Sequence, residues 1–275
     1  PNENTAPDIT GGFIFKSDKS DPGDVRVSTP NAGSFAITYP KEGQITNAQK
    51  DYLQNYLREF EIALEGPSFA DPNIGYAAYI DVDSWIDMHV IQELAKEVDS
   101  YRFSTFYYKD QGGKIVCGPL WDYDRSFGNV NSNGVNNPEG WWGGPGGTRG
   151  VFWERLFEDP NFEQLFIDRW QELMDSTLSK PYLNTLIDQM AAEVNEAKDR
   201  NFQPSGGPWP LANVTRSHLT FPTYAEHVDY LRDWLGDRLD WVAREWTDKP
   251  TFELPPGNYN GMLNLTLNAP TGAIY

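Results

Sequence analysis

The stretch GPLWDYDRSFGN, residues 118–129, is the part of this sequence that decides which fold to expect. It continues an apolar run at 115–117 and carries two carboxylates, Asp122 and Asp124, just before a Phe-Gly pair. A short apolar run followed by glycine is typical of a buried strand that ends in a turn. The sequence therefore predicts two anionic side chains at the end of a buried strand.

The residues around this strand predict a β-hairpin. Two strand-like runs, RFSTFYYK at 102–109 and KIVCGPLW at 114–121, are separated by Asp-Gln-Gly-Gly. Glycine-containing linkers of this length between alternating runs are a strong hairpin signal. A two-residue turn at 111–112 places Lys109 opposite Lys114, and we expect both amines to be solvated.

The same register brings three carboxylates together. It places Asp99 opposite Asp124 and Tyr101 opposite Asp122, and an extended backbone directs Asp122 and Asp124 to one face. Like charges so close together repel unless a proton or a cation neutralises them. A magnesium ion held by one or two carboxylates and by ligand phosphates meets this need. In the alternative interpretation, Asp122 caps the turn and Asp124 caps a following helix.

Amphipathic patterns predict helices on both sides of the hairpin. Thr46 and Gln49 have the spacing of a capping box at the start of a helix that Gly66 and Pro67 end near residue 65. A second helix, at about 84–97, leads to the aspartate at 99. The remaining elements expected are helices at about 150–178 (broken at Pro160), 181–201 and 223–246, and strands at 11–18 and 33–40.

Composition excludes several classes of protein. The 275 residues include 40 acids and 22 bases, which give a net charge of −18. This charge argues against a nucleic-acid or anionic-membrane surface, and a phosphorylated ligand would need a divalent metal or a local basic patch. No apolar run is long enough for a membrane span. The one cysteine, Cys117, is expected to be a small buried hydrophobe.

The two ends of the sequence differ from its middle. The chain begins at Pro1, and we expect it to be a processed product or an excised piece. After Pro250 apolar and polar residues alternate, so we expect a domain over 1–250 and the truncated start of a β-sandwich module over 251–275. That tail, PPGNYNGMLNLTLNAPTGAIY, is similar to the start of the chitobiase C-terminal-type, fibronectin-like module found in exported bacterial proteins.

The block at 79–129 resembles the spore-coat protein H (CotH) kinase family. Members of this family have a helix, a VDxYRxST stretch, a YKDxGGK turn and a GPxWDxDxxFGN stretch in this order, and the present sequence has each of them. Weaker similarity continues through 140–142, 152–162, 169–173 and 228–242. The resemblance implies an α+β, mainly helical, protein-kinase-like catalytic lobe whose short β-hairpin carries the metal-binding aspartates. It also implies ATP-dependent phosphorylation of Ser or Thr in a protein substrate, with Mg or Mn as cofactor.

The resemblance assigns roles to four residues. Asp99 matches the catalytic-loop aspartate of the family, and Asp122 matches its magnesium-binding aspartate. Asp124, the second acid of the motif, would be a further metal ligand or would anchor the ligands from behind, and with Asp99 would complete the set around the ion and nucleotide. Arg102 matches the arginine of the family's YR pair and would offset negative charge or touch phosphate, a role compatible with a salt bridge to one of the aspartates.

The sequence also departs from ordinary protein kinases. Ser104 stands where they place a metal-binding Asn, five residues after the catalytic aspartate. Lys16 and Lys19 come too late to supply the phosphate-pairing lysine of a nucleotide-binding lobe, whose elements precede the strand at 11–18 in this family. We therefore expect those lobe elements to be largely missing, and nucleotide turnover by these 275 residues alone to be weak.

Two other function classes compete with the kinase. One is a non-catalytic secreted or surface binding module, with Trp141 and Trp142 on a mobile loop at 130–150 contacting a glycan or matrix. The other is a glycoside hydrolase, suggested by paired acids and ten tryptophans. For the kinase we expect a bacterial protein that is secreted or at the cell surface, with a nucleotide and a protein substrate as partners.

Overall fold

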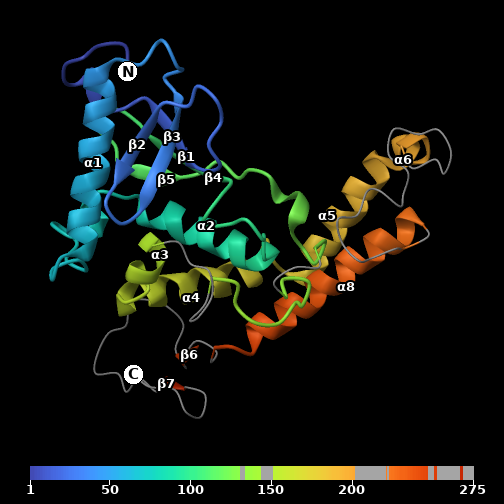
Figure 1. The fold of residues 1–275 in the computed structure, drawn as a ribbon. Coiled ribbons are helices and arrows are strands. Elements are labelled where there is room, and N and C mark those ends of the chain that lie inside the picture. The colour runs from blue at the N-terminus through green and yellow to red at the C-terminus, as the bar shows by residue number, and fades with distance from the viewer. Residues whose placement is uncertain are drawn as a thin grey trace, which may run out of the picture.

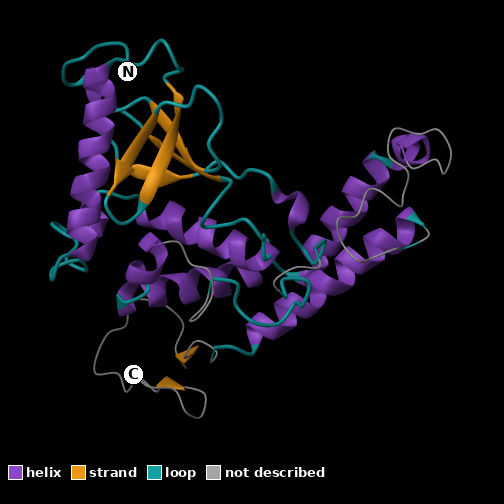
Figure 2. Ribbon diagram, in the orientation of Figure 1, coloured by secondary structure: helices purple, strands orange, loops and turns teal. Residues whose placement is uncertain are grey.

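The computed structural model describes most of the chain (Figure 1). The described residues are 1–130, 134–143, 151–201, 221, 223–246, and the strand residues 251–252 and 267–268. A small antiparallel sheet packs beside one long helix, and the other helices gather below the sheet and extend away from it (Figure 2). The mixed architecture, mainly helical with one small sheet, agrees with the α+β class expected from the sequence. A kinase-like lobe remains a prediction.

Five strands form the main sheet in the order β2-β3-β1-β4-β5, and all neighbours are antiparallel. Their bounds are Phe13–Ser17 (β1), Arg26–Thr29 (β2), Gly33–Tyr39 (β3), Thr105–Lys109 (β4) and Ile115–Cys117 (β5). The strands expected at 11–18 and 33–40 are confirmed as β1 and β3, whereas β2 was not predicted. Because β1 pairs with β4, the hairpin is part of a larger sheet that includes the N-terminal strands.

Helix α1, Asn47–Glu65, begins as the sequence predicts. The Thr46 hydroxyl accepts a hydrogen bond from the Gln49 amide, and the Gln49 side chain accepts one from the Thr46 amide, which completes the capping box. The helix lies along one side of the sheet (Figure 1). Its buried residues follow helical spacing and are Gln49, Leu53, Leu57, Phe60, Glu61 and Leu64.

Helix α2, Val82–Ala95, crosses beneath the sheet, and its C-terminal end leads into the segment that carries Asp99 (Figure 1). Asp81 caps it by accepting from the Ser84 amide at 2.9 Å. Most of its last three turns are buried, as is typical of a helix inside a core. It ends two residues before the predicted end because Lys96 adopts a left-handed conformation, with φ 44°.

The remaining helices form the lower layer and a projecting arm (Figure 1). The predicted break at Pro160 is confirmed, because Asp159 caps a new helix there by accepting from the Asn161 amide. The helices are α3 (Val151–Leu156), α4 (Pro160–Met174), α5 (Lys180–Glu193), α6 (Asn195–Asn201) and α8 (Tyr224–Ala243), and short 3-10 turns lie at Asp8–Thr10, Tyr76–Ala78 and Tyr123–Arg125. None of the described helices is long and apolar enough to span a bilayer.

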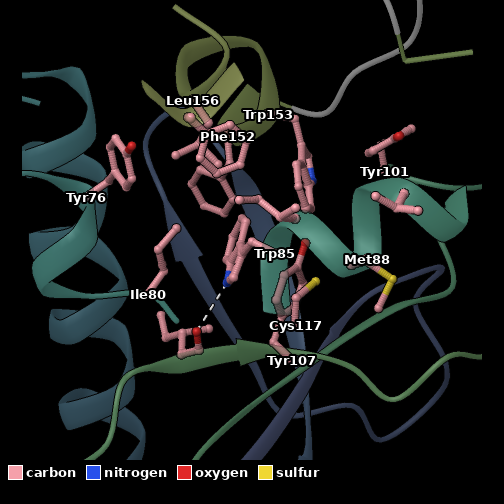
Figure 3. Close-up of a cluster of buried hydrophobic side chains, with 14 of the residues drawn as sticks. Tyr76, Ile80, Trp85, Met88, Tyr101, Tyr107, Cys117, Phe152, Trp153 and Leu156 are labelled. Atoms are coloured by element: carbon pink, nitrogen blue, oxygen red, sulfur yellow. Dashed lines mark hydrogen bonds between the residues drawn. The ribbon is translucent and has the colours of Figure 1, made fainter. Parts of the chain in front are cut away.

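An aromatic core joins the sheet to the helices (Figure 3). Trp85 of α2 lies at its centre: its indole N–H donates to the Ile115 carbonyl at 3.1 Å, and its ring lies 5.0 Å from that of Trp153. Cys117 is buried in this core, as expected. Burial of large aromatic side chains supplies most of the hydrophobic stabilisation in such an arrangement.

The tail from 251 onward is described only in part. Two-residue strands, β6 (Thr251–Phe252) and β7 (Leu267–Asn268), pair antiparallel. The rest of the predicted β-sandwich module lies outside the described residues.

Candidate functional site

The hairpin register differs from the prediction by one residue. Tyr107 pairs with Cys117 and Lys109 pairs with Ile115. The predicted two-residue turn is wrong because the connection spans five residues, 110–114, and the Gly113 amide closes it by donating to the Asp110 carbonyl at 3.0 Å. A one-residue shift moves every side chain of a strand to the other face.

The expectation that the Lys109 amine is solvated is wrong. This side chain is buried, with 2% of its surface exposed, and its amine donates to the carbonyls of Thr10 (2.5 Å) and Gly113 (2.7 Å). The amine also lies 4.4 Å from the centre of the Tyr56 ring. Burial lowers the pKa of Lys109. Lys114 is exposed, as predicted.

The predicted extended geometry of the two acids after the strand is wrong. The sheet contact ends where the Gly118 amide donates to the Phe106 carbonyl at 2.8 Å, and the next residue, Pro119, has no N–H to continue the ladder. Asp122 then adopts a left-handed conformation with φ 64°, and Asp124 lies within a 3-10 turn. The two acids therefore do not share the face of an extended strand, and Asp99 and Asp124 are not strand partners.

The alternative interpretation, in which these acids cap local structure, fits only in part. Asp122 occupies the N-cap position of the turn at Tyr123–Arg125, but its side chain makes no capping hydrogen bond. Asp124 lies inside that turn and caps no following helix. Both side chains are exposed.

Two segments distant in sequence nevertheless meet at one place. The segment 96–104 leaves α2, the segment 118–129 leaves β5, and the Phe127 amide donates to the Ala95 carbonyl at 2.7 Å. A guanidinium nitrogen of Arg125 lies 3.4 Å from Asp99 Oδ2. The predicted meeting of the residue at 99 with the motif at 118–129 is thus present, through an ion pair and a backbone bond.

These two segments hold all the non-glycine residues with positive φ that the described backbone contains. They are Lys96, Tyr101, Ser104, Asp122 and Phe127. Left-handed conformations of side-chain-bearing residues cost free energy, and they cluster at functional sites where the surrounding structure enforces them. The backbone therefore marks the same region as the sequence motif.

Asp99 lies between two arginines. Its Oδ1 is 3.5 Å from Arg102, and its Oδ2 is 3.4 Å from Arg125. The salt bridge considered for Arg102 is therefore present, while most of that guanidinium side chain is exposed, with 59% of its surface accessible. Sequence reasoning missed Arg125, although its position directly after Asp124 in the motif was a usable signal.

Sequence reasoning also missed Glu97, a further acid that contacts the backbone of Asp99. It is 2% exposed, and its carboxylate accepts the Asp99 amide at 2.7 Å. Burial, together with smaller effects of the Asp99 and Asp122 charges, raises the pKa of Glu97 to about 7. A carboxyl group with a strongly perturbed pKa is a common property of functional sites.

Comparison with known protein families gives the identity of the domain. Residues 6–242 match the model of the CotH kinase protein family. The chain belongs to this family. No curated protein matches the sequence. The family match covers both segments of the site and supports a kinase-like domain.

In this CotH-family domain, protein side chains could supply only some of the ligands of a metal ion at the site. Among the described residues, no three His, Cys, Asp or Glu side chains are placed to hold an ion together, so the predicted convergence of Asp99, Asp122 and Asp124 around a metal is not present in this geometry. The exposed carboxylates of Asp122 and Asp124 do fit magnesium in its usual mode, in which one or two acids are completed by phosphates and water.

Two arginines and one lysine lie on or against the segments of this site, in a chain of net charge −18. Arg102 and Arg125 pair with Asp99, whereas Lys16 on β1 pairs with Asp18 and Asp21. The Lys19 amine lies 5.4 Å from the centre of the Phe103 ring, and the Arg102 guanidinium lies 4.5 Å from it. The Ser17 hydroxyl donates to the Arg102 carbonyl at 2.9 Å, which ties β1 to this segment. Lys19 and Arg102 are thus two exposed cations that lie against one ring in the segment that carries Asp99.

The tryptophans of the predicted mobile loop belong to the core of the CotH domain. Trp141 lies 4.9 Å from Trp241 and 5.1 Å from Trp246, and the Trp142 indole donates to the Ser100 hydroxyl at 3.0 Å. Packed rings offer little surface to a glycan, so the binding-module alternative loses its expected contact. The glycine run at 143–147 lies, after its first residue, outside the described residues.

Proposed function

We propose that this CotH-family domain transfers the γ-phosphate of ATP to a Ser or Thr hydroxyl of a protein substrate. The observation that carries the proposal is the meeting of the Asp99 segment with the Asp122 segment at the ends of α2 and β5. In kinase-like folds, one such aspartate serves the acceptor hydroxyl and the other serves the metal.

Each residue of the site has a role in this proposal. Asp99, held between Arg102 and Arg125, orients the acceptor hydroxyl and takes its proton. Asp122 would hold magnesium, with Asp124 as a further ligand, and the ion would supply positive charge to neutralise phosphate oxygens. Arg102 and Lys19 are exposed and lie against the same Phe103 ring, from which they can contact the phosphates.

The role of Glu97 follows from its burial. Its carboxylate accepts the Asp99 amide and therefore fixes the direction in which the Asp99 side chain leaves the backbone. Positioning of this kind contributes to catalysis because small displacements of a catalytic group cost large factors in rate.

Labelled ATP tests the proposal directly. The domain is incubated with magnesium, ATP labelled at the γ-phosphate and a protein rich in Ser, and label in the acceptor is measured. We expect Asp122→Ala and Asp99→Asn each to lower label transfer by roughly 100-fold or more. Removal of magnesium with a chelator should abolish transfer.

Asp51→Ala is the matched control, because Asp51 is an exposed acid on α1 outside the site. Its label transfer should equal that of the unchanged protein. Because turnover by these 275 residues alone is expected to be weak, the test uses the longest available form of the protein. Absence of label transfer from that form, with ATP binding measured separately, would refute the kinase proposal and leave a binding module on this scaffold as the better account.

A further inference from the structure

A buried carboxylate lies directly beneath the Asp99 segment. Glu93 of α2 has no exposed surface. Its Oε1 accepts the Tyr101 hydroxyl at 3.0 Å and the Gly143 amide at 2.5 Å, and its Oε2 accepts the Trp142 amide at 2.9 Å. One carboxylate therefore joins α2, the segment that carries Asp99, and the backbone at residues 142–143.

Helix α8 supplies the countercharge. Arg238 is fully buried, and its Nη2 lies 3.3 Å from Glu93 Oε2. Its Nε and Nη2 donate to the Glu93 carbonyl, and its Nη1 donates to the carbonyls of Pro138 and Gly140. A buried charge pair is tolerated only when its remaining hydrogen-bonding groups are also satisfied, and this pair meets that condition through backbone carbonyls and amides.

Tyr101 connects this pair to the site. Its φ of 67° is left-handed, a conformation that an aromatic residue adopts only when its surroundings enforce it. The ring is 4% exposed and lies 5.6 Å from Trp153, and the hydroxyl is also 2.7 Å from His89 Nδ1. Two residues earlier is Asp99, whose carbonyl accepts the Phe103 amide at 2.8 Å and closes the turn around Tyr101.

We propose that Tyr101 is a positioning residue for Asp99. Its hydroxyl, fixed on Glu93, holds the left-handed turn that sets where the Asp99 carboxylate points. Because Arg238 of α8 is bonded to Glu93, helix α8 also helps to hold this turn. The catalytic consequence rests on the proposed phosphoryl transfer, whereas the anchoring of the turn does not.

Tyr101→Phe is the decisive variant, because it keeps the ring and removes only the hydroxyl. Tyr76→Phe is its matched control. Tyr76 is 5% exposed and its hydroxyl donates to Asp159 Oδ2 at 2.7 Å, so the control loses the same kind of buried bond to a carboxylate. Figure 3 shows Tyr76 and Tyr101 at opposite ends of the core cluster.

The first measurement is hydrogen exchange of the amides of Asp99 and Phe103, which donate within the anchored segment. We expect exchange to become at least about tenfold faster in Tyr101→Phe and to stay within about twofold in Tyr76→Phe, since local opening follows loss of a local anchor. The midpoint of urea unfolding, measured on both variants, shows that each remains folded.

The second measurement is steady-state label transfer from ATP. We expect Tyr101→Phe to lower kcat about 10- to 100-fold with KM for ATP within about twofold, the pattern of a misplaced catalytic group. Tyr76→Phe should leave both constants unchanged. If the unchanged protein transfers no label, the proposed function fails while the exchange result still decides the anchoring.

Two results would overturn the inference. Equal exchange of these amides in both variants would show that the hydroxyl does not hold the turn. Faster exchange with an unchanged kcat would show that the turn is held but does not position Asp99 for transfer.

Discussion

At the scale of single residues, the buried side chain of Lys109 is held by hydrogen bonds. Its amine satisfies two carbonyls and lies over the Tyr56 ring. We expect Lys109→Met to lower the free energy of unfolding by about 1–3 kcal/mol, because the Thr10 and Gly113 carbonyls lose their donor in a buried place. Urea unfolding of the purified domain measures the change.

Lys114→Met is the control for that variant, because Lys114 follows the same turn with an exposed side chain. Its amine donates to the Ala77 carbonyl at 2.6 Å in solvent, and we expect a change within about 0.5 kcal/mol. Equal losses in the two variants would contradict the distinction between a buried and a solvated lysine at the two ends of the turn.

Lys96 makes stability depend on pH. Burial, followed by the charge of Arg238, lowers its pKa in the folded protein from 10.5 to about 8. Between these values the unfolded chain binds more protons than the folded one, so the free energy of unfolding rises with pH. From pH 8 to pH 10 we expect a gain of about 2 kcal/mol from this group.

Lys96→Met isolates the effect of this amine, whose donors otherwise serve the carbonyls of Asn137 and Glu139. The variant should lack this part of the rise in stability toward pH 10. Urea unfolding at both pH values gives the difference. An identical rise in the variant would mean that other groups cause it.

At the scale of elements, the helices were predictable because their signals are local. The capping box at Thr46 and the stop at Pro160 act within a few residues, and both are present as expected. The hairpin register was not predictable, because it depends on how Asp110 and Gly113 close the turn and on the pairing of β4 with β1. A tertiary contact of this kind leaves no periodic pattern in the sequence.

The candidate site likewise contains residues that the sequence could predict and residues that it could not. Asp99 and Asp122 were found through a motif at fixed spacing, and the segments that carry them meet through the Arg125–Asp99 ion pair and a backbone hydrogen bond. Glu97 and Arg125 were missed because their importance comes from burial and from an ion pair across two segments. The left-handed backbone at Asp122 replaces an extended one because the ladder ends before Pro119.

Helix α8 offers a stabilising substitution. Gly236 lies within the helix, and a Cβ atom added there would meet no other atom within 4 Å. Gly236→Ala should raise the free energy of unfolding by about 0.5–1 kcal/mol, because alanine restricts the unfolded chain and suits a helix. Thermal or urea unfolding measures the gain.

Gly128→Ala provides the opposite case. Gly128 has φ 78°, and an added Cβ atom would lie 2.5 Å from the Tyr230 hydroxyl. We expect a loss of about 1–3 kcal/mol from strain and steric overlap. A similar loss of unfolding free energy in Gly236→Ala would contradict the open space around a Cβ atom at residue 236.

At the scale of the whole molecule, one core supports both halves of the site. The segment 96–104 leaves α2 and the segment 118–129 leaves β5, and α2 and β5 both pack into the same aromatic cluster. The site is therefore fixed from its two ends by packing, while Asp122 and Asp124 face solvent at the surface. This arrangement combines a rigid frame with groups that remain accessible to a ligand.

The net charge of −18 has a consequence for the stability of the entire domain. Excess negative charge favours expansion, whereas exposed ion pairs such as Arg232 with Asp188 contribute little. Since salt screens both effects, and repulsion among surplus acids is the larger, we expect the melting temperature to rise by about 2–4 °C from 10 to 300 mM NaCl. Sucrose at equal osmolarity is the uncharged control and should give a smaller rise. A melting temperature that falls with NaCl would mean that attractive pairs outweigh the repulsion.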